Sequence, residues 1–390
     1  MTRTRILLGV SSVAILMAAK AEAGTLWVAN MNQAQEVPPT GVPYTGTGFL
    51  ILNDAESSAV VTATHNIPAA IVTGGHIHRG PVGVNGPIIL PFPNNGVSPV
   101  GPLTWAIPSA EVVNLKADGL YMNIHTQQFP AGAIRGQIVP SLLATSATNA
   151  PQLAVANALD VSAGFTPDLD LVLMSAAVAS AGTNAQLLDD LSAGTVYVQG
   201  RHAVETMASF QETLFSLTED LAGSSAQGFG LFATAGDSFG KRDAVIGQPR
   251  SKISRPWVLA GVDFGSGAGV RGGLGVGYAK GKDKVRGGFG KTDVETTSVQ
   301  AFVSTGQKVV VSAVAGYGWN KFDTQRNIAS LGRTASSSHD GKVWALGAKV
   351  SAPLTLNSNL NISPYGQVDM QHARIKAYSE TGAGSVGLVV

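Results

Sequence analysis

The chain has 390 residues, which is enough for two or three domains, and its formal net charge is +1 at pH 7. So small a charge argues against the basic surface by which nucleic-acid-binding proteins are recognised. Charged residues make up 13% of the chain and glycine accounts for 47 residues, a composition that is unusual for a soluble enzyme and ordinary for a membrane barrel. There is no cysteine, so an exported form of the chain would depend on its core or its strand ladder rather than on disulfides.

Residues 1–23 have the features of an export signal. Arg3 and Arg5 form a positively charged start, Ile6–Ala19 an apolar stretch, and Ala21–Ala23 a cleavage site of the A-x-A kind. The apolar stretch is too short for a membrane anchor, and no later segment is apolar over the length that a spanning helix needs. We therefore expect any membrane insertion to use strands, because lipid admits only helices and closed barrels.

Residues 24–140 predict an all-β domain. Short runs rich in β-branched and aromatic residues alternate with turns that contain proline, glycine or asparagine. This rhythm is typical of a β-sandwich. The expected strands are Leu26–Met31, Thr47–Leu52, Ala59–His65, Gly75–His78, Leu103–Ile107, Leu120–Thr126 and Ile134–Val139.

Histidines in this domain are spaced so that they share a face. His76 and His78 are two residues apart, and His125 alternates in the same way with the apolar residues of its own strand. If the two strands are neighbours, three imidazoles converge, and His65 at the end of another strand could supply a fourth. Neutral imidazole nitrogens suit copper or zinc. The alternative is that these histidines hydrogen-bond to backbone groups or to one another at the rim of the sheet.

Two phrases of this domain are similar in order and spacing to the CHRD domain, a β-sandwich module common in bacterial secreted proteins: Gly75–Gly80, and Tyr121–Thr126 followed by Pro130–Gln137. The resemblance covers Thr25–Ile138 and implies an Ig-like or Greek-key sandwich. The family usually has an acidic residue where Ala133 stands, so any role of that carboxylate is not carried over. The H-x-H pair on a sandwich also resembles copper–zinc superoxide dismutases, by analogy of fold and spacing alone.

Residues 141–225 change in character and predict a helical linker. A polar spacer leads into segments rich in alanine and leucine, and apolar residues then recur at intervals of three or four, which marks one face of a helix near 204–221. These residues are Val204, Met207, Phe210, Leu214, Leu217 and Leu221. One interpretation is a helix that packs on a neighbouring soluble domain. The other is a helix inside a barrel lumen, which its position directly before the strands favours.

Residues 226–390 repeat an alternation of apolar with small or polar side chains. In Val309–Asn320 the apolar row ends in Tyr317 and Trp319, as expected for an aromatic girdle at a membrane interface. We expect Val309, Val311, Ala313 and Ala315 to face hydrocarbon, and Ser312, Gly316 and Asn320 to face a lumen. The expected strands are Phe229–Thr234, Pro256–Phe264, Val270–Tyr278, Thr296–Thr305, Val309–Phe322, Asp340–Leu354 and Asn359–Ala377, with the start of an eighth near Ser385.

The stretch Pro151–Val390 resembles the autotransporter β-domain of type V secretion. The resemblance rests on the order of five phrases, which are Gln152–Asp160, Leu187–Ser192, Gly273–Tyr278, Ile362–Tyr365 and Tyr378–Ala383. It implies an antiparallel outer-membrane β-barrel. The family's barrel has twelve strands and a terminal aromatic residue, whereas this sequence has seven strands and part of an eighth and stops at Val390. We therefore expect either that further strands are encoded beyond Val390 or that the gene is degenerate.

The leading hypothesis is an outer-membrane autotransporter, not an enzyme, that displays or secretes a CHRD passenger at the surface of a Gram-negative cell. Its expected partners are outer-membrane lipid, the outer-membrane assembly machinery, periplasmic chaperones and an unknown extracellular ligand, with no nucleic acid. No P-loop is present in the sequence. Two alternatives stay open: a soluble periplasmic or secreted CHRD binding protein, and a copper- or zinc-dependent redox domain on the same sandwich.

Overall fold

The computed structural model describes residues 24–389, except 193, 222–227, 244–249, 267–268, 286, 288, 307 and 358–359. The expected export signal, residues 1–23, lies outside the described residues. The chain divides into two compact units, an N-terminal unit of Ala18–Ser192 with Gly384–Val386 and a C-terminal unit that includes Ala193–Ala383 and Gly387–Val390. The expected linker, 141–225, is thus shared between the two units.

The N-terminal unit contains eight strands in one antiparallel sheet, ordered β5-β4-β7-β8-β1-β2-β3-β6. All seven expected strands are present, and β5 is an eighth that sequence analysis missed. The strands are β1 (Gly24–Asn32), β2 (Thr45–Asn53), β3 (Ala59–His65), β4 (Val72–Arg79), β5 (Ile88–Pro91), β6 (Val100–Trp105), β7 (Leu120–Thr126) and β8 (Ile134–Pro140).

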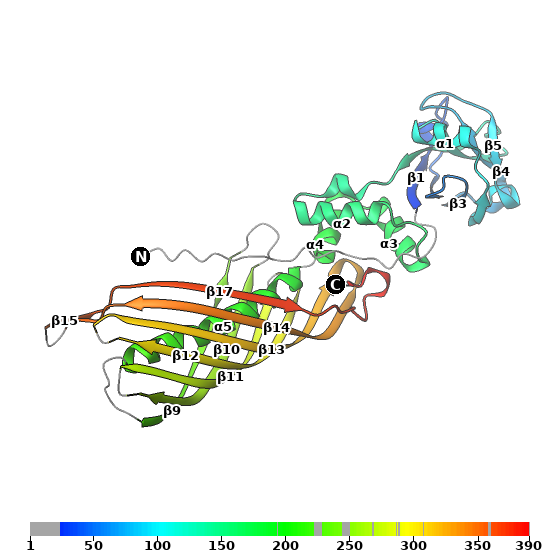
Figure 1. Ribbon diagram of the computed structural model, residues 1–390. Coiled ribbons are helices and arrows are strands. Elements are labelled where there is room, and N and C mark those ends of the chain that lie inside the picture. The colour runs from blue at the N-terminus through cyan, green and yellow to red at the C-terminus, as the bar shows by residue number, and fades with distance from the viewer. Residues whose placement is uncertain are drawn as a thin grey trace. The chain divides into compact units, whose positions relative to one another are not determined.

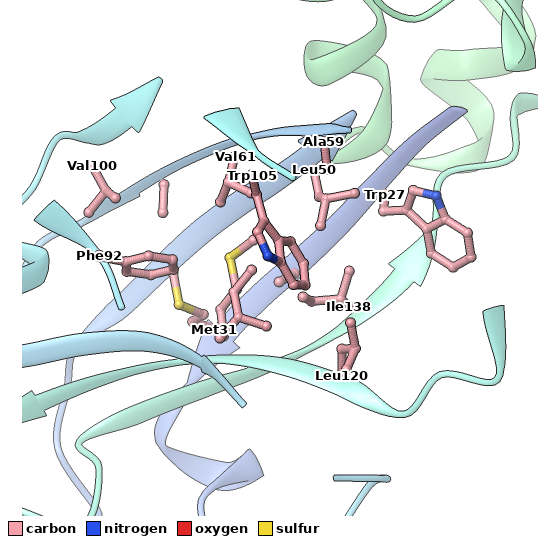
Figure 2. Close-up of a cluster of buried hydrophobic side chains, with 14 of the residues drawn as sticks. Trp27, Met31, Leu50, Ala59, Val61, Phe92, Val100, Trp105, Leu120 and Ile138 are labelled. Carbon is pink, nitrogen blue, oxygen red and sulfur yellow. The ribbon is translucent and has the colours of Figure 1, made fainter. Parts of the chain in front are cut away.

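The hydrophobic core of this unit lies where the sheet folds over on itself. A Cβ atom at Gly48 in β2 would lie only 2.1 Å from the Sδ atom of Met122 in β7, although three strand spacings separate β2 from β7 in the sheet. Leu50, Trp105 and Ile138 therefore meet in one cluster from strands on both sides (Figure 2). Two facing halves around one core confirm the expected sandwich.

Four helices accompany this sheet in the N-terminal unit. They are α1 (Ser109–Lys116), α2 (Ala150–Asp160), α3 (Pro167–Ala177) and α4 (Ala181–Leu191). Asn149, Thr166 and Ser180 each cap the start of one of the last three, with a side-chain oxygen that accepts from a backbone N–H of the first turn. The capping residues explain why this alanine-rich stretch breaks into three short helices.

The C-terminal unit is built on a seven-stranded antiparallel sheet, ordered β17-β14-β13-β12-β11-β10-β9. Its strands are β9 (Gly228–Arg242), β10 (Ser251–Gly265), β11 (Val270–Val285), β12 (Gly290–Thr305), β13 (Val310–Ile328), β14 (Arg333–Ser351) and β17 (Tyr365–Ile375), with a small hairpin of β15 (Leu354–Asn357) and β16 (Leu360–Ile362). All seven expected strands are found. The prediction that an eighth strand starts near Ser385 is wrong, because Gly384–Val386 form a single 3-10 turn.

The long helix α5 (Gly194–Leu221) runs along the inside of this curved sheet (Figure 1). It contains the expected amphipathic helix and begins ten residues earlier than the 204–221 predicted from the sequence. Met207, Phe210 and Leu214 are fully buried against sheet residues such as Phe302 and Phe322. No helix in the described part of the chain is both long and apolar enough to cross a membrane.

Candidate functional site

The C-terminal sheet is apolar on its outside, whereas its inside carries many polar side chains beside the apolar cluster that packs on α5. Along β13, Val311 and Trp319 are each 47% exposed, whereas Ser312 and Asn320 are each 3% exposed. The apolar side chains that point outward also include Val258, Leu274, Val276, Val299, Val303, Leu346, Val350, Val368 and Met370. A water-soluble sheet has the opposite arrangement, whereas an outward apolar band around a polar interior is the pattern of outer-membrane barrels. The alternation along β13 is the one expected from the sequence.

Polar side chains on the inside of the sheet bind α5 from every one of the seven strands. Two close pairs belong to this network: Glu205 pairs with Arg255 at 2.9 Å, and His202 bonds Asp283 at 2.7 Å. The remaining contacts join Glu205 to Arg242 in β9, Met207 to Gln300 in β12, Gln199 to Thr324 in β13 and to His339 in β14, and Gln211 to Gln371 in β17. The interior of the sheet is therefore fitted to this helix.

A second polar cluster lies in the N-terminal unit, on the side of β4 and β7 that faces away from the core. Antiparallel pairing sets His76 opposite Asn123 and His78 opposite Tyr121, and His125 follows two pairs further along, on the same face. The imidazole centroids are 5.0 Å apart for His76 and His125, 5.5 Å for His76 and His78, and 5.8 Å for His78 and His125. One candidate ligand atom from each ring lies within 4.8 Å of the others. The structure thus brings together three of the four expected histidines.

His65 lies elsewhere, and both of its ring nitrogens are occupied. Its Nε2 atom is 2.8 Å from the carbonyl oxygen of Gly96, and its Nδ1 atom accepts from the backbone N–H of Ile67 at 3.2 Å. A carbonyl oxygen only accepts, so Nε2 carries the proton and Nδ1 the lone pair. His65 therefore fits the alternative that we weighed, a histidine that ties backbone segments together.

Backbone carbonyls fix the tautomers of two clustered histidines. His78 Nδ1 donates to Gly86 O at 3.0 Å, and His125 Nδ1 donates to Pro130 O at 3.0 Å. Each ring then has its lone pair on Nε2, and both of these atoms are buried without a hydrogen-bond partner among the described residues. His76 Nδ1 is likewise buried and unpartnered within the described chain.

Burial keeps all three rings neutral. Desolvation lowers the pKa of His76 from 6.5 to about 4, helped by the neighbouring His125 and His78. Burial likewise lowers the pKa of His78 and of His125, and in each case the backbone hydrogen bond opposes the change. The cluster at neutral pH is consequently a set of uncharged nitrogen donors.

A buried acid next to this cluster was missed by sequence reasoning. Glu36 is 4% exposed, and burial raises its pKa from 4.5 to about 7, against the lowering effects of Asn123 and Arg135. It accepts a hydrogen bond from Asn123 Nδ2 at 3.4 Å. The two side chains fit beside Gly132 because it has no Cβ atom, which would lie 2.6 Å from the Asn123 amide and 2.7 Å from Glu36 Oε1. The one signal was that Glu36 is the sole acidic residue between Gly24 and Asn53.

Arg135 and the residues around it close the other end of the cluster. Its guanidinium donates to Pro81 O at 2.8 Å and to Val84 O at 3.1 Å, and it lies 3.5 Å from the centroid of Tyr121. Tyr121 in turn stacks on His78, with centroids 4.9 Å apart. Arg135 is thus held by carbonyls and an aromatic face, and the charge nearest to the histidines on this side is positive.

Comparison with known families identifies both parts of the chain. Residues 27–138 match the model of the CHRD domain, and residues 231–390 match the model of the autotransporter beta-domain. The chain carries a CHRD domain followed by an autotransporter β-domain. Both resemblances drawn from the sequence are therefore confirmed. This combination supports an autotransporter-type protein associated with the outer membrane.

Among solved structures, the chain is similar to the translocator domain of the autotransporter NalP from Neisseria meningitidis. The two share 16% sequence identity and superpose with a TM-score of 0.41, over 47% of this chain and 64% of that one. This chain thus spans somewhat less than two thirds of the NalP domain. A comparison with curated protein sequences gave no match.

Proposed function

We propose that this protein is an outer-membrane autotransporter that holds its CHRD domain at the cell surface. The observation that carries the proposal is the sheet of the C-terminal unit, which exposes apolar side chains and turns polar ones toward α5. Exposed valine, leucine and tryptophan along β13 and its neighbours would be costly in water and favourable in hydrocarbon.

The helix α5 supports the direction of display. It follows the N-terminal unit directly in the chain and makes side-chain contacts with all seven strands of the sheet. A segment so fitted to the interior can join an exported domain to the barrel without a lipid-exposed loop, which bilayers do not tolerate. The residues that make this connection, Glu205 and His202 among them, are buried or half-buried.

Export in this proposal involves no chemical reaction by the protein. The periplasm offers no nucleotide, so folding of the barrel and of the passenger would supply the free energy. The partners we propose are outer-membrane lipid, the outer-membrane assembly machinery, periplasmic chaperones and an extracellular ligand of the CHRD domain.

Protease accessibility on intact Gram-negative cells tests the proposal. The full chain, with an epitope after Gly24, should lose that epitope when proteinase K is added outside, while the C-terminal unit stays in the envelope pellet and changes its gel mobility on heating. The matched control is residues 1–192 alone, which should stay soluble in the periplasm and protected until the outer membrane is opened.

Protection of the epitope in intact cells, with digestion after permeabilisation, would refute surface display. Recovery of the full chain in the soluble fraction would refute the membrane location as well, and would favour the alternative of a soluble periplasmic CHRD protein.

A further inference from the structure

We propose that His76, His78 and His125 form a mononuclear site for a transition metal of the copper and zinc class on the CHRD domain. The proposal concerns the N-terminal unit alone and does not depend on where the chain is located. It rests on four observations: the direction of the lone pairs, the room left for the rings, the donor set, and the access to solvent.

The ring nitrogens of His78 and His125 are arranged like those of metal-bound histidines. A metal-bound histidine usually donates its other ring N–H to a carbonyl or carboxylate, which fixes the tautomer and orients the ring. His78 and His125 already have this arrangement, with Nδ1 bound to Gly86 O and Pro130 O. Their Nε2 atoms are buried without a partner in the described structure, at side chains that are 7% and 9% exposed overall. Buried polar atoms normally have a hydrogen-bond or metal partner, so two unpaired nitrogen lone pairs in one cluster indicate a bound ion that both could ligate.

The backbone leaves space for the three rings. Gly74 lies opposite His125 in the ladder, and a Cβ atom on it would be 3.0 Å from His76 Cε1 and 3.8 Å from His125 Cδ2. Nitrogens that bind one tetrahedral zinc ion at about 2.0–2.1 Å are about 3.3 Å apart. The ligand atoms here lie within 4.8 Å, so small rotations of the rings would complete the geometry.

The donor set selects the class of metal. The group consists of three imidazoles, and no aspartate or glutamate joins it among the described residues. Calcium and magnesium require oxygen ligands, whereas copper and zinc take neutral imidazole nitrogen readily. The guanidinium of Arg135, stacked on Tyr121 beside His78, further disfavours a hard cation held mainly by charge.

Access from solvent makes the site exchangeable. His76 is partly exposed, whereas His78 and His125 are buried, so the open side of the cluster is the side of His76. Three protein ligands leave a fourth position, which in zinc and copper sites is taken by water or an external ligand. We therefore expect a site that chelators empty and that a small anion such as azide can reach.

The test uses the full chain, purified in detergent without a polyhistidine tag and stripped with EDTA. We expect one equivalent of Zn²⁺ or Cu²⁺ to bind with a dissociation constant below micromolar, measured by competition with a chromophoric chelator. Mg²⁺ and Ca²⁺ should not compete. The Cu²⁺ form should show hyperfine structure from imidazole nitrogens in electron paramagnetic resonance, and azide should change the spectrum.

Three variants and one control assign the binding to this cluster. His76→Ala and His125→Ala should each weaken binding by more than about 100-fold, because outer-shell changes alone cost about 10–100-fold. Gly74→Ala keeps all three histidines but places a methyl group in the space that their rings occupy. It should therefore weaken metal binding, while the metal-free protein still folds. His65→Ala, which removes a histidine whose two nitrogens are already bonded, should leave affinity unchanged.

Folding of each metal-free variant is followed separately by tryptophan fluorescence. If a histidine variant does not fold, the affinity of Gly74→Ala for the metal tests the proposal instead. Absence of stoichiometric binding to the wild-type chain would overturn the proposal. Binding that survives in His76→Ala and His125→Ala, or that falls equally in His65→Ala, would also overturn it. Preference between Zn²⁺ and Cu²⁺ in the same competition identifies which of the two metals the site takes.

Discussion

Replacement of Glu36 by glutamine should stabilise the N-terminal unit at neutral and alkaline pH but not at acidic pH. The carboxyl is 4% exposed, and burial raises its pKa from 4.5 to about 7. Its folded pKa therefore lies above its unfolded pKa. As pH rises from about 4.5 to about 7, the unfolded chain releases the proton while the folded chain retains it, so stability falls across this window.

The size of this loss follows from the two pKa values. They differ by about 2.5, and each pKa unit corresponds to about 1.4 kcal/mol, so the carboxyl costs about 3 kcal/mol of folding free energy at pH 8. Glutamine has nearly the same shape, does not ionise, and keeps an oxygen that can accept from Asn123. Glu36→Gln should thus match the wild type at pH 4 and exceed it by about 2–3 kcal/mol at pH 8.

Urea unfolding followed by tryptophan fluorescence measures the effect in the full chain. The chain has five tryptophans, of which Trp27 and Trp105 lie in the N-terminal core, so phenylalanine at the other three leaves a local probe. EDTA keeps the neighbouring histidines free of metal. Glu56→Gln is the matched control, since Glu56 is an exposed acid paired with Lys116, and its effect should stay within about 0.5 kcal/mol. A Glu36→Gln effect that does not change with pH would refute the reasoning.

Two further substitutions test the outer face of the sheet and the folding of the sandwich. Ala313→Arg places a charge on the exposed face of β13 and should cost about 2–4 kcal/mol near the bilayer midplane, whereas Ala313→Leu should be tolerated; equal amounts of heat-modifiable barrel in both variants would contradict a lipid face. Gly48→Ala forces a Cβ atom against the Met122 side chain and should cost about 1–3 kcal/mol in the same urea assay, whereas the same change added to Met122→Ala should cost much less, because the opposing side chain is gone; an unchanged midpoint in the single variant would contradict the close approach.

The alternation of side chains along single strands could be predicted from the sequence. Ser312 and Val311 lie on opposite faces of β13 because a strand has a period of two, and no tertiary information is needed to see it. The face of α5 around Phe210 follows in the same way from the helical period. His76 and His78 were placed on one face by the same rule, and the structure agrees.

The partners of these strands could not be predicted, because pairing is decided by contacts between distant parts of the chain. The three-histidine cluster needed β4 and β7 to be neighbours, which the sequence allowed but did not require. His65 has as good a local pattern as His125, yet its strand pairs with β2 and β6, and its ring bonds to Gly96 instead. The short strand β5 carries no alternation long enough to recognise.

The chemical character of the cluster depends on the loops that bury the outer face of β7, and a local sequence pattern does not predict where these loops lie. All seven residues of this strand are buried, on the polar side as well as on the core side. The loops that supply Gly86 O, Pro130 O and Val84 O account for that burial, and turn residues in a sequence do not indicate where a loop lies. Without these loops, His78 and His125 would be rim histidines hydrated by water, and Glu36 would be an ordinary acid. The lone pairs, the lowered pKa values and the raised pKa of Glu36 are therefore all consequences of tertiary structure, acting on side chains that the sequence had placed on the correct face.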